Sequence, residues 1–226
     1  MNVADLLTGT LAEEIAAASE LRVYVETTPA TGVAARAARR LGAERLALVR
    51  GFTALDGAQR DWVTDVFTLL RRGLLGVAVT PVQLDAAGRT NLSGIGPPGR
   101  PKVALIGPRG LPENNDTPCP LWYLLAAHSP RTLVERVDMV CGAAPSSAAG
   151  PRTLLTPAGC FDLLESRWRA RWLAPGGEEL VAAAPALGID VAAGTPVREA
   201  PSAEALAALR AVDPEGARGA EFPSQP

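Results

Sequence analysis

Histidine and cysteine are scarce in this sequence of 226 residues. The single histidine, His128, excludes a metal site built from several histidines, and any Ser-His-Asp triad would have to use it. His128 ends an apolar run just before a turn, so we expect a strand-end histidine whose ring is satisfied by the protein. The three cysteines are an odd number without a Cys-x-x-Cys pair, which predicts free thiols and no metal site: Cys119, Cys141 and Cys160.

An excess of basic charge is also missing. The chain has 22 Lys+Arg against 24 Asp+Glu, a net charge of −2, and Lys102 is its only lysine. Binding to nucleic acid or to an anionic membrane needs clustered positive charge, so we expect neither partner. No apolar run approaches the ~18–20 residues of a membrane-spanning helix. The N-terminal segment MNVADLLTGTLAEE is acidic where a signal peptide would be basic, and we therefore expect a cytoplasmic protein.

Hydrophobic residues are plentiful at 47%, which supports a sizeable core and excludes global disorder. In the first eighty residues, helical and strand-like segments alternate. Helical spacing covers 4–19, an Ala/Arg-rich stretch ending at 41, and 61–72, while short β-prone runs cover 21–25, 45–49 and 75–79. This alternation predicts an α/β fold with an open, mostly parallel sheet and helices on both faces.

The second half of the chain has a different texture. Short β-prone runs are separated by Gly/Pro loops with few helices between them, at 103–106, 123–126, 133–137, 153–155 and 168–173. Helical stretches at 178–186 and 203–212 close the pattern. No internal repeat is present, so we predict a single domain over 1–213 and a flexible C-terminal tail over 214–226.

One glycine motif has a formal match to a nucleotide-binding fingerprint. The segment Gly94-Ile-Gly96-Pro-Pro-Gly99 fits G-x-G-x-x-G, but that fingerprint requires a preceding strand and a helix that opens inside it. The prolines favour an extended or turn backbone here, and a β-prone run follows. We therefore expect no nucleotide cofactor.

Two loops at strand ends carry the polar chemistry of the sequence. In the first, Gln83 and Asp85 alternate onto one face, and Gly88 permits a tight turn before Asn91. Ligands of α/β sheets usually bind at strand ends, although a simple turn with capping amides explains the same pattern.

The second loop carries a guanidinium and amides between two glycines. Gly107 and Gly110 allow backbone N–H groups to approach a ligand, and Arg109 and Asn114 can donate to a developing oxyanion. The alternative is an ordinary surface loop, since Gly, Pro and Asn are common there.

Taken in order, these motifs resemble the β subunit of class I CoA-transferases of the glutaconate type. The resemblance spans roughly residues 20–216. Each motif is weak alone, but their order and spacing are fairly specific. They are Gln83-x-Asp85-x-x-Gly88-x-x-Asn91, Arg100-Pro101-Lys102, Gly107-x-x-Gly110, Arg131-Thr-x-Val-Glu135-Arg-Val-Asp138, Pro157-Ala-Gly-Cys-Phe161-Asp162, Leu173-Ala-Pro175-Gly176 and Leu209-Arg-Ala-Val-Asp213-Pro214.

The sequence departs from the transferases where their nucleophile stands. Those enzymes carry a glutamate just after the second strand, and it attacks the thioester to form an acyl-enzyme anhydride. Here that place reads Val49-Arg50-Gly51-Phe52-Thr53, without a carboxylate until Asp56. The family's Gly-x-Gly-Gly loop has become Gly107-Pro-Arg-Gly110, followed by Pro112 and Asn114, which is similar to the β subunit of CoA-transferase-like steroid ring-opening hydrolases.

The resemblance implies one half of an obligate heteromer with an α subunit of the same family. It implies an acyl-CoA thioester as substrate, cleaved hydrolytically at a carbon–carbon bond, with the catalytic carboxylate on the α subunit and no metal. Arg109 and Asn114 would be catalytic. Two alternatives stay open, namely CoA transfer between carboxylic acids and a non-catalytic scaffold. The implied substrate- or CoA-binding residues are Gln83, Asp85, Asn91, Gly107, Gly110 and Arg50.

Overall fold

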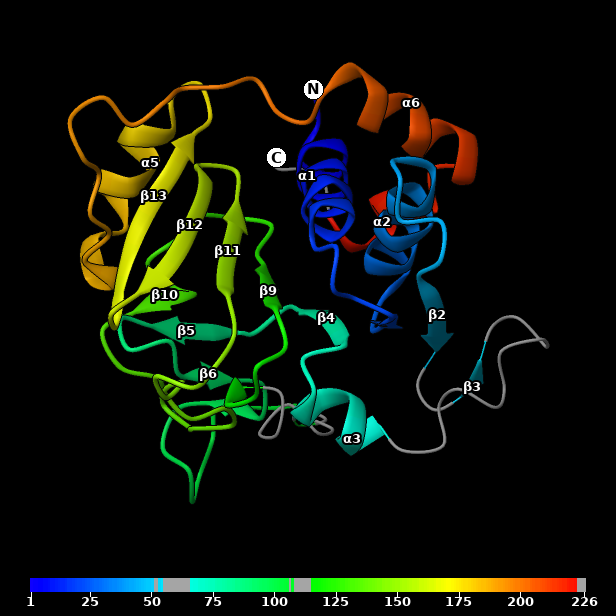
Figure 1. Cartoon of the computed structure of the whole chain (residues 1–226). Coiled ribbons are helices and arrows are strands. Elements are labelled where there is room, and N and C mark those ends of the chain that lie inside the picture. Colours follow the sequence, from blue (N-terminus) through cyan, green and yellow to red (C-terminus); the bar gives the residue numbers. More distant parts are fainter. Residues whose placement is uncertain (51–52, 55–65, 106, 108–114, 223–226) are drawn as a thin grey trace. The chain divides into compact units, whose positions relative to one another are not determined.

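The computed structural model of the chain describes residues 1–50, 53–54, 66–105, 107 and 115–222. The chain divides into two compact units, Met1–Ala78 with Glu199–Pro226, and Val79–Arg198. Each unit is described by itself (Figure 1). The organisation as a single domain stays a prediction. Within the described residues, no helix is both long and apolar enough to cross a membrane.

The first unit is built on parallel strands with α-helical connections. Its strands are ordered β4–β1–β2–β3, with β1 parallel to both β4 and β2, and β3 antiparallel to β2. The elements are α1 (Val3–Ala17), β1 (Val23–Glu26), α2 (Pro29–Arg40), β2 (Ala47–Arg50), β3 (Thr53–Ala54), α3 (Val66–Arg71), β4 (Leu75–Val79), α6 (Ala203–Val212) and the 3₁₀ helix η3 (Ala217–Glu221).

Alternate residues of β1 serve the two faces of this sheet. Val23 packs with Ala47 and Val49 in a buried cluster, and Leu69 of α3 packs against it. Tyr24 and Glu26 lie on the opposite face, where Arg36 of α2 donates to Glu26. Helices therefore cover both faces, and the α/β fold with an open, mostly parallel sheet is confirmed.

Local signals in the sequence explain where the helices of this unit begin. Asn2 caps α1 by accepting from the Asp5 N–H at 2.7 Å, and Thr28 forms a capping box with Thr31 ahead of α2. Part of the predicted flexible tail is folded in η3, where Arg218 forms ion pairs with Asp5 and Asp213. The flexibility of the tail stays a prediction.

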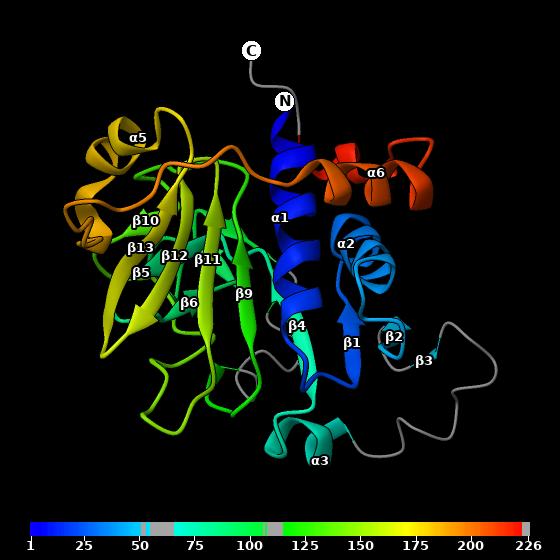
Figure 2. The ribbon, with the colours of Figure 1, turned by 45° about the horizontal axis from the view of Figure 1, so that its top comes forward.

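Among the described residues, the strands of the second unit lie in three sheets. The largest has the order β13–β12–β11–β9, in which β9 and β11 are parallel, whereas β12 is antiparallel to both β11 and β13. Figure 2 shows β11, β12 and β13 side by side. The elements are β5 (Gln83–Asp85), β6 (Thr90–Asn91), β7 (Gly94–Ile95), β8 (Val103–Ala104), β9 (Leu121–Leu124), β10 (Leu133–Val134), β11 (Arg152–Thr156), β12 (Gly159–Leu164), β13 (Arg167–Leu173), α5 (Gly177–Ala183) and the 3₁₀ helix η2 (Pro185–Leu187).

Aromatic residues join the large sheet of this unit to the small β10–β5–β6 sheet. The Trp168 indole N–H donates to the Asp85 carbonyl at 3.2 Å, and its ring meets Tyr123 edge to face with centroids 6.0 Å apart. The Tyr123 hydroxyl donates to Asn115 Oδ1 at 2.9 Å. Each buried polar tip thus has a partner, as aromatic packing in a core requires. The strand carrying Gln83 and Asp85 is therefore held firmly against the core.

Candidate functional site

The structure brings Gln83 and Asn91 together, as the turn at Gly88 predicts. They face each other across the β5–β6 pair, both are buried, and Asn91 Nδ2 donates to Gln83 Oε1 at 2.7 Å. Gln83 Nε2 in turn donates to Asp138 Oδ2 at 3.1 Å, and Gln83 Oε1 also accepts from the Asp138 N–H at 2.9 Å. The two buried amides and the carboxylate of the exposed Asp138 form one hydrogen-bonded network.

This network shapes the segment that leads to the second predicted loop. Asn91 Oδ1 accepts from the Ser93 N–H, Asn91 Nδ2 donates to the Gly94 carbonyl, and Asp138 Oδ2 accepts from the Gly96 N–H. These bonds fix the start of the β7–β8 hairpin. The observed geometry is that of a scaffold that positions backbone, and direct contact of Gln83 or Asn91 with substrate stays a prediction.

Asp85 has a separate set of partners. Its fully buried carboxylate accepts from Arg89 Nε at 2.8 Å and from the backbone N–H groups of Ala87 and Arg89 at 3.0 Å. Gly88, inside this turn, has φ +78°, a conformation that favours glycine. Asp85 thus organises its own turn, and its role in binding stays a prediction.

The second predicted loop is only partly within the described residues. Gly107 has φ +93°, so the glycine permits a backbone conformation that other residues rarely adopt. Arg109, Gly110 and Asn114 lie outside the described residues. Asn115, the next described residue, is fully buried.

Arg152 anchors the chain where it leaves this loop. It is 2% exposed, and its guanidinium donates to backbone carbonyls. The carbonyl oxygens that accept are those of Asn115, Thr117, Cys119, Gly150 and Pro151. Burial lowers the pKa of the Arg152 guanidinium, and nearby negative groups oppose that shift. These carbonyl contacts of Arg152, here called the carbonyl cage, connect the segment that begins at Asn115 to the first residue of β11.

Arg50 is placed in the first unit, at the C-terminal end of β2. Its register partner is Glu26 at the end of β1, and Arg50 Nε lies 3.8 Å from Glu26 Oε2. The other carboxylate oxygen of Glu26 accepts from Arg36 Nη1 at 3.0 Å. The side chain of Arg50 is 69% exposed whereas that of Glu26 is 2% exposed. The buried carboxylate at the C-terminal end of β1 thus faces two guanidiniums, those of Arg36 and Arg50.

A glycine of α2 makes room for this carboxylate. A Cβ atom at Gly32 would stand 2.8 Å from Glu26 Cδ, closer than real Cβ contacts come. Burial raises the pKa of the Glu26 carboxyl, and the charges of Arg36 and Arg50 oppose that rise.

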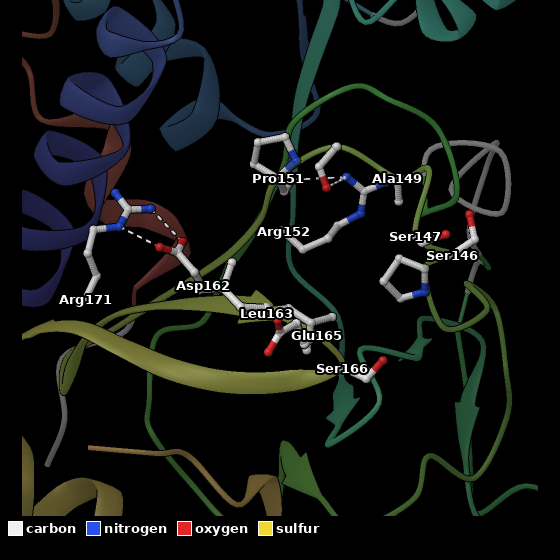
Figure 3. Close-up of a pocket in the computed structure, with 13 residues that line it drawn as sticks. Ser146, Ser147, Ala149, Pro151, Arg152, Asp162, Leu163, Glu165, Ser166 and Arg171 are labelled. Carbon is white, nitrogen blue, oxygen red and sulfur yellow. Dashed lines mark hydrogen bonds and ion pairs between the residues drawn. The ribbon is translucent and has the colours of Figure 1, made fainter. Parts of the chain in front are cut away.

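A cavity of about 530 Å³ opens in the second unit beside the β12–β13 hairpin (Figure 3). Charged side chains that line it already have partners within the protein. Arg171 donates to both oxygens of Asp162 at 2.6 and 2.8 Å, and Arg152 donates to backbone carbonyls. Of the predicted site residues that the structure describes, none lines it. In the described part of the chain, no group of three or more His, Cys, Asp or Glu is arranged to hold a metal.

Comparison with known proteins identifies the fold. No protein-family model matches the sequence, and no curated protein matches it. Glutaconate CoA-transferase from Acidaminococcus fermentans superimposes with a TM-score of 0.74 at 16% identity, over 100% of this chain and 98% of that one. The chain has the CoA-transferase fold. The resemblance noted in the sequence is confirmed at the level of the fold.

Two further solved structures share the CoA-transferase fold with this chain. IpdAB from Rhodococcus jostii RHA1 has a TM-score of 0.79 at 24% identity, with 98% of each chain covered. The decarboxylase AibA/AibB has a TM-score of 0.75 at 23% identity, over 97% of this chain and 98% of that one. The chain therefore matches nearly the whole length of each similar chain.

Glu26 and Arg152 are buried charged residues with structural contacts that the sequence pattern did not predict. Glu26 is the only acidic residue in β1, and a lone carboxylate that ends an apolar strand is a usable signal. Its burial depends on the pairing of β1 with β2, which no local pattern reveals. Arg152 starts a strand after Gly150-Pro151 and has no sequence signal of burial.

His128 is buried, but it lies in the segment after β9 and not at a strand end as expected, and only one nitrogen of its ring has a hydrogen-bond partner among the described residues. Its Nδ1 lies 2.9 Å from Thr156 Oγ1, whereas Nε2 is buried without a hydrogen bond among the described residues. The ring packs against Phe161 with centroids 5.5 Å apart. Burial lowers the pKa of His128 to about 4.

We expect the free energy of unfolding to fall as the pH drops below about 6.5, because His128 then binds a proton in the unfolded state but stays neutral in the folded state. The loss begins at the unfolded pKa of about 6.5 and grows until the folded pKa, and it amounts to about 2–3 kcal/mol. Urea unfolding at pH 7.0 and pH 5.0 measures it. His128→Asn keeps a polar group near the position of Nδ1 but has no titrating ring, so its free energy of unfolding should change less between the two pH values. An equal change in this variant and the wild type would show that His128 is not the group responsible.

Proposed function

We propose that the chain is one subunit of a cytoplasmic, heteromeric enzyme that acts on an acyl-CoA thioester by hydrolytic carbon–carbon cleavage. The observation that carries the proposal is Arg50 at the end of β2, the place where the resembling transferases have their nucleophilic glutamate. A guanidinium cannot attack a thioester, so transfer through an anhydride on this chain has no nucleophile at that place.

Glu26 does not replace the missing nucleophile. Its side chain is 2% exposed, and one of its oxygens is bonded to Arg36 at 3.0 Å. Attack on a thioester carbonyl requires a carboxylate oxygen within about 3–3.5 Å of the carbon, which a carboxylate enclosed by α2 cannot reach. The similarity in fold to the decarboxylase AibA/AibB supports a reaction other than CoA transfer.

In the proposed reaction, the partner subunit's carboxylate removes a proton from water. The resulting hydroxide adds to the β-carbonyl carbon of the acyl group, and the bond between the α and β carbons breaks. The electron pair moves into the enolate of the thioester, which Arg109 and Asn114 stabilise before it is protonated at carbon. Gln83, Asp85, Asn91, Gly107 and Gly110 support or contact the substrate in this proposal.

The names of AibA/AibB and IpdAB denote complexes of two different subunits, which supports an α subunit as partner. Assembly and chemistry are tested together by co-expression of this chain with an α subunit of the same family. A stable complex that hydrolyses a β-keto acyl-CoA supports the proposal. A complex that moves CoA to a free carboxylate instead supports the transferase alternative, and a complex inert toward every acyl-CoA supports the scaffold.

We expect no covalent CoA adduct on this chain. The complex is incubated with acetoacetyl-CoA, and each subunit is weighed by intact mass spectrometry, first untreated and then after borohydride or hydroxylamine, which release CoA from an enzyme thioester and leave the carboxyl group as an alcohol or a hydroxamate. A matched control is Arg50→Glu, which places a carboxylate where the transferases carry theirs. A CoA-sized mass increase on the wild-type chain would restore the transferase reading.

A further inference from the structure

We propose that Arg50 binds an anionic oxygen group of the acyl-CoA substrate and that Glu26 is the positioning residue that holds its guanidinium in place. This inference rests on the proposed function and names the substrate chemistry that Arg50 recognises. The group bound is a carboxylate on the acyl chain or a phosphate of CoA, since both present the paired oxygens that a guanidinium recognises.

The first step in the argument is location. β1 and β2 are parallel, and Glu26 and Arg50 are register partners at their C-terminal ends. Ligands of open α/β sheets bind outside the carboxyl ends of the strands. Arg50 therefore stands at the edge where a ligand is expected, and 69% of its side chain is exposed there.

The second step is the uneven use of the two oxygens of Glu26. Oε1 has a hydrogen bond from Arg36, but Oε2 is buried and lacks a hydrogen-bond partner among the described residues. An ion pair that only tied β1 to α2 would be complete with Arg36. The second oxygen faces Arg50 Nε at 3.8 Å, a distance that holds the guanidinium by charge without occupying it with a tight hydrogen bond.

The third step is the space reserved for this carboxylate. Gly32 lies on α2 beside Glu26, where a Cβ atom would be 2.8 Å from both Cδ and Oε2. A glycine inside a helix is unfavourable relative to alanine, so the close approach is what favours glycine here. The fold thus places a buried negative charge beneath an exposed positive one.

The fourth step is the balance of charge. One carboxylate lies between two guanidiniums, so the group formed by Glu26, Arg36 and Arg50 has a net charge of about +1. Glu26 approaches Arg50 through Nε, and within the described part of the chain nothing bonds to its two Nη groups, which suits the planar, two-pronged contact that arginine makes with carboxylate or phosphate. The excess charge and this geometry both favour an anionic ligand.

The test measures binding of four probes to the complex of this chain with its α subunit, by isothermal titration calorimetry. The probes are glutaryl-CoA, butyryl-CoA and 3′-dephospho-CoA paired with CoA. If Arg50 binds the acyl carboxylate, the wild type should prefer glutaryl-CoA over butyryl-CoA by about 10-fold or more, and Arg50→Gln should abolish the preference. If it binds the 3′-phosphate, Arg50→Gln should weaken CoA and both thioesters alike and leave dephospho-CoA unaffected, and if it binds the diphosphate, Arg50→Gln should weaken all four probes alike.

Glu26 is tested in the same assay by a double-mutant cycle. Glu26→Gln should reduce the Arg50-dependent preference by roughly 3–10-fold, and the same change in an Arg50→Gln background should have no further effect. A merely structural role would weaken both backgrounds equally. Arg50→Lys should retain part of the preference, and Arg45→Gln, an exposed arginine before the N-terminal end of β2, should retain all of it.

The inference is overturned if Arg50→Gln binds every probe like the wild type, and the role of Glu26 is overturned if the cycle is additive. Because Arg50 is exposed, its substitution leaves the core unchanged, and we expect its variants to fold like the wild type. If the complex turns over acyl-CoA and the Arg50 variants bind every probe as the wild type does, this inference is wrong but the proposed function is not. A complex that binds no CoA compound overturns the proposed function and this inference together.

Discussion

Replacement of Arg152 by lysine is expected to lower the free energy of unfolding by about 3–5 kcal/mol. The guanidinium is 2% exposed and donates to five carbonyl oxygens, at distances from 2.7 to 3.3 Å. A lysine ammonium has only three donors on a flexible stem and lacks the planar fork. Some of the carbonyls would be left buried without a donor, and the desolvated charge would lose part of its compensation.

Urea unfolding of the complex with its α subunit, followed by far-UV circular dichroism, measures this loss. Arg167→Lys is the matched control, because Arg167 is an exposed arginine on β13 of the same unit and its change should stay within about 0.5 kcal/mol. Equal small losses in both variants would show that the carbonyl cage contributes little to stability. A loss confined to Arg152→Lys also means that the segment following the predicted Arg109–Asn114 loop depends on this anchor.

Elements with complete local signals are those that the sequence predicted best. β4 at Leu75–Val79 and α6 at Ala203–Val212 have the predicted boundaries. α6 also has a local start signal, since Ser202 Oγ accepts from the Ala205 N–H at 3.1 Å. Where periodicity and a cap agree, the boundaries follow from the residues themselves.

Elements defined by pairing were predicted less well. β9 was expected at 123–126 but is Leu121–Leu124, because the apolar run continues on both sides and only its parallel pairing with β11 sets the ends. β6 and β7 contain two residues each, too few to show any period. β12 was indicated only by the family resemblance, since a strand buried at one end and exposed at the other has no simple alternation.

In the candidate site, too, contacts set by local sequence could be predicted and contacts set by tertiary pairing could not. The closeness of Gln83 and Asn91 follows from a tight turn between two short strands and could be predicted. Asp138, which completes that network, comes from a distant part of the sequence and depends on tertiary packing. The pairing of Arg50 with Glu26 likewise requires two parallel strands in a particular register, which the sequence pattern does not specify.

Arg109→Ala in the complex is expected to lower kcat by about 10²–10³-fold while KM changes little. In the proposed cleavage, negative charge reaches the thioester oxygen only as the carbon–carbon bond breaks. A guanidinium that stabilises that charge acts on the transition state and contributes little to ground-state binding, so its loss lowers kcat and kcat/KM together. Arg109→Lys should recover only part of the rate, since lysine keeps the charge but loses the fork.

The measurement is steady-state kinetics of the wild type and both variants, with thermal unfolding of each complex as a control for folding. Arg100→Ala is a matched control, because Arg100 is an exposed arginine in the turn between β7 and β8, ahead of Gly107 in sequence. If Arg109 is an ordinary surface residue, its removal should change stability by no more than about 0.5 kcal/mol and leave kcat unchanged. A well-folded Arg109→Ala complex with wild-type turnover would exclude this residue from the catalytic step, and the enolate would then need a donor from the α subunit.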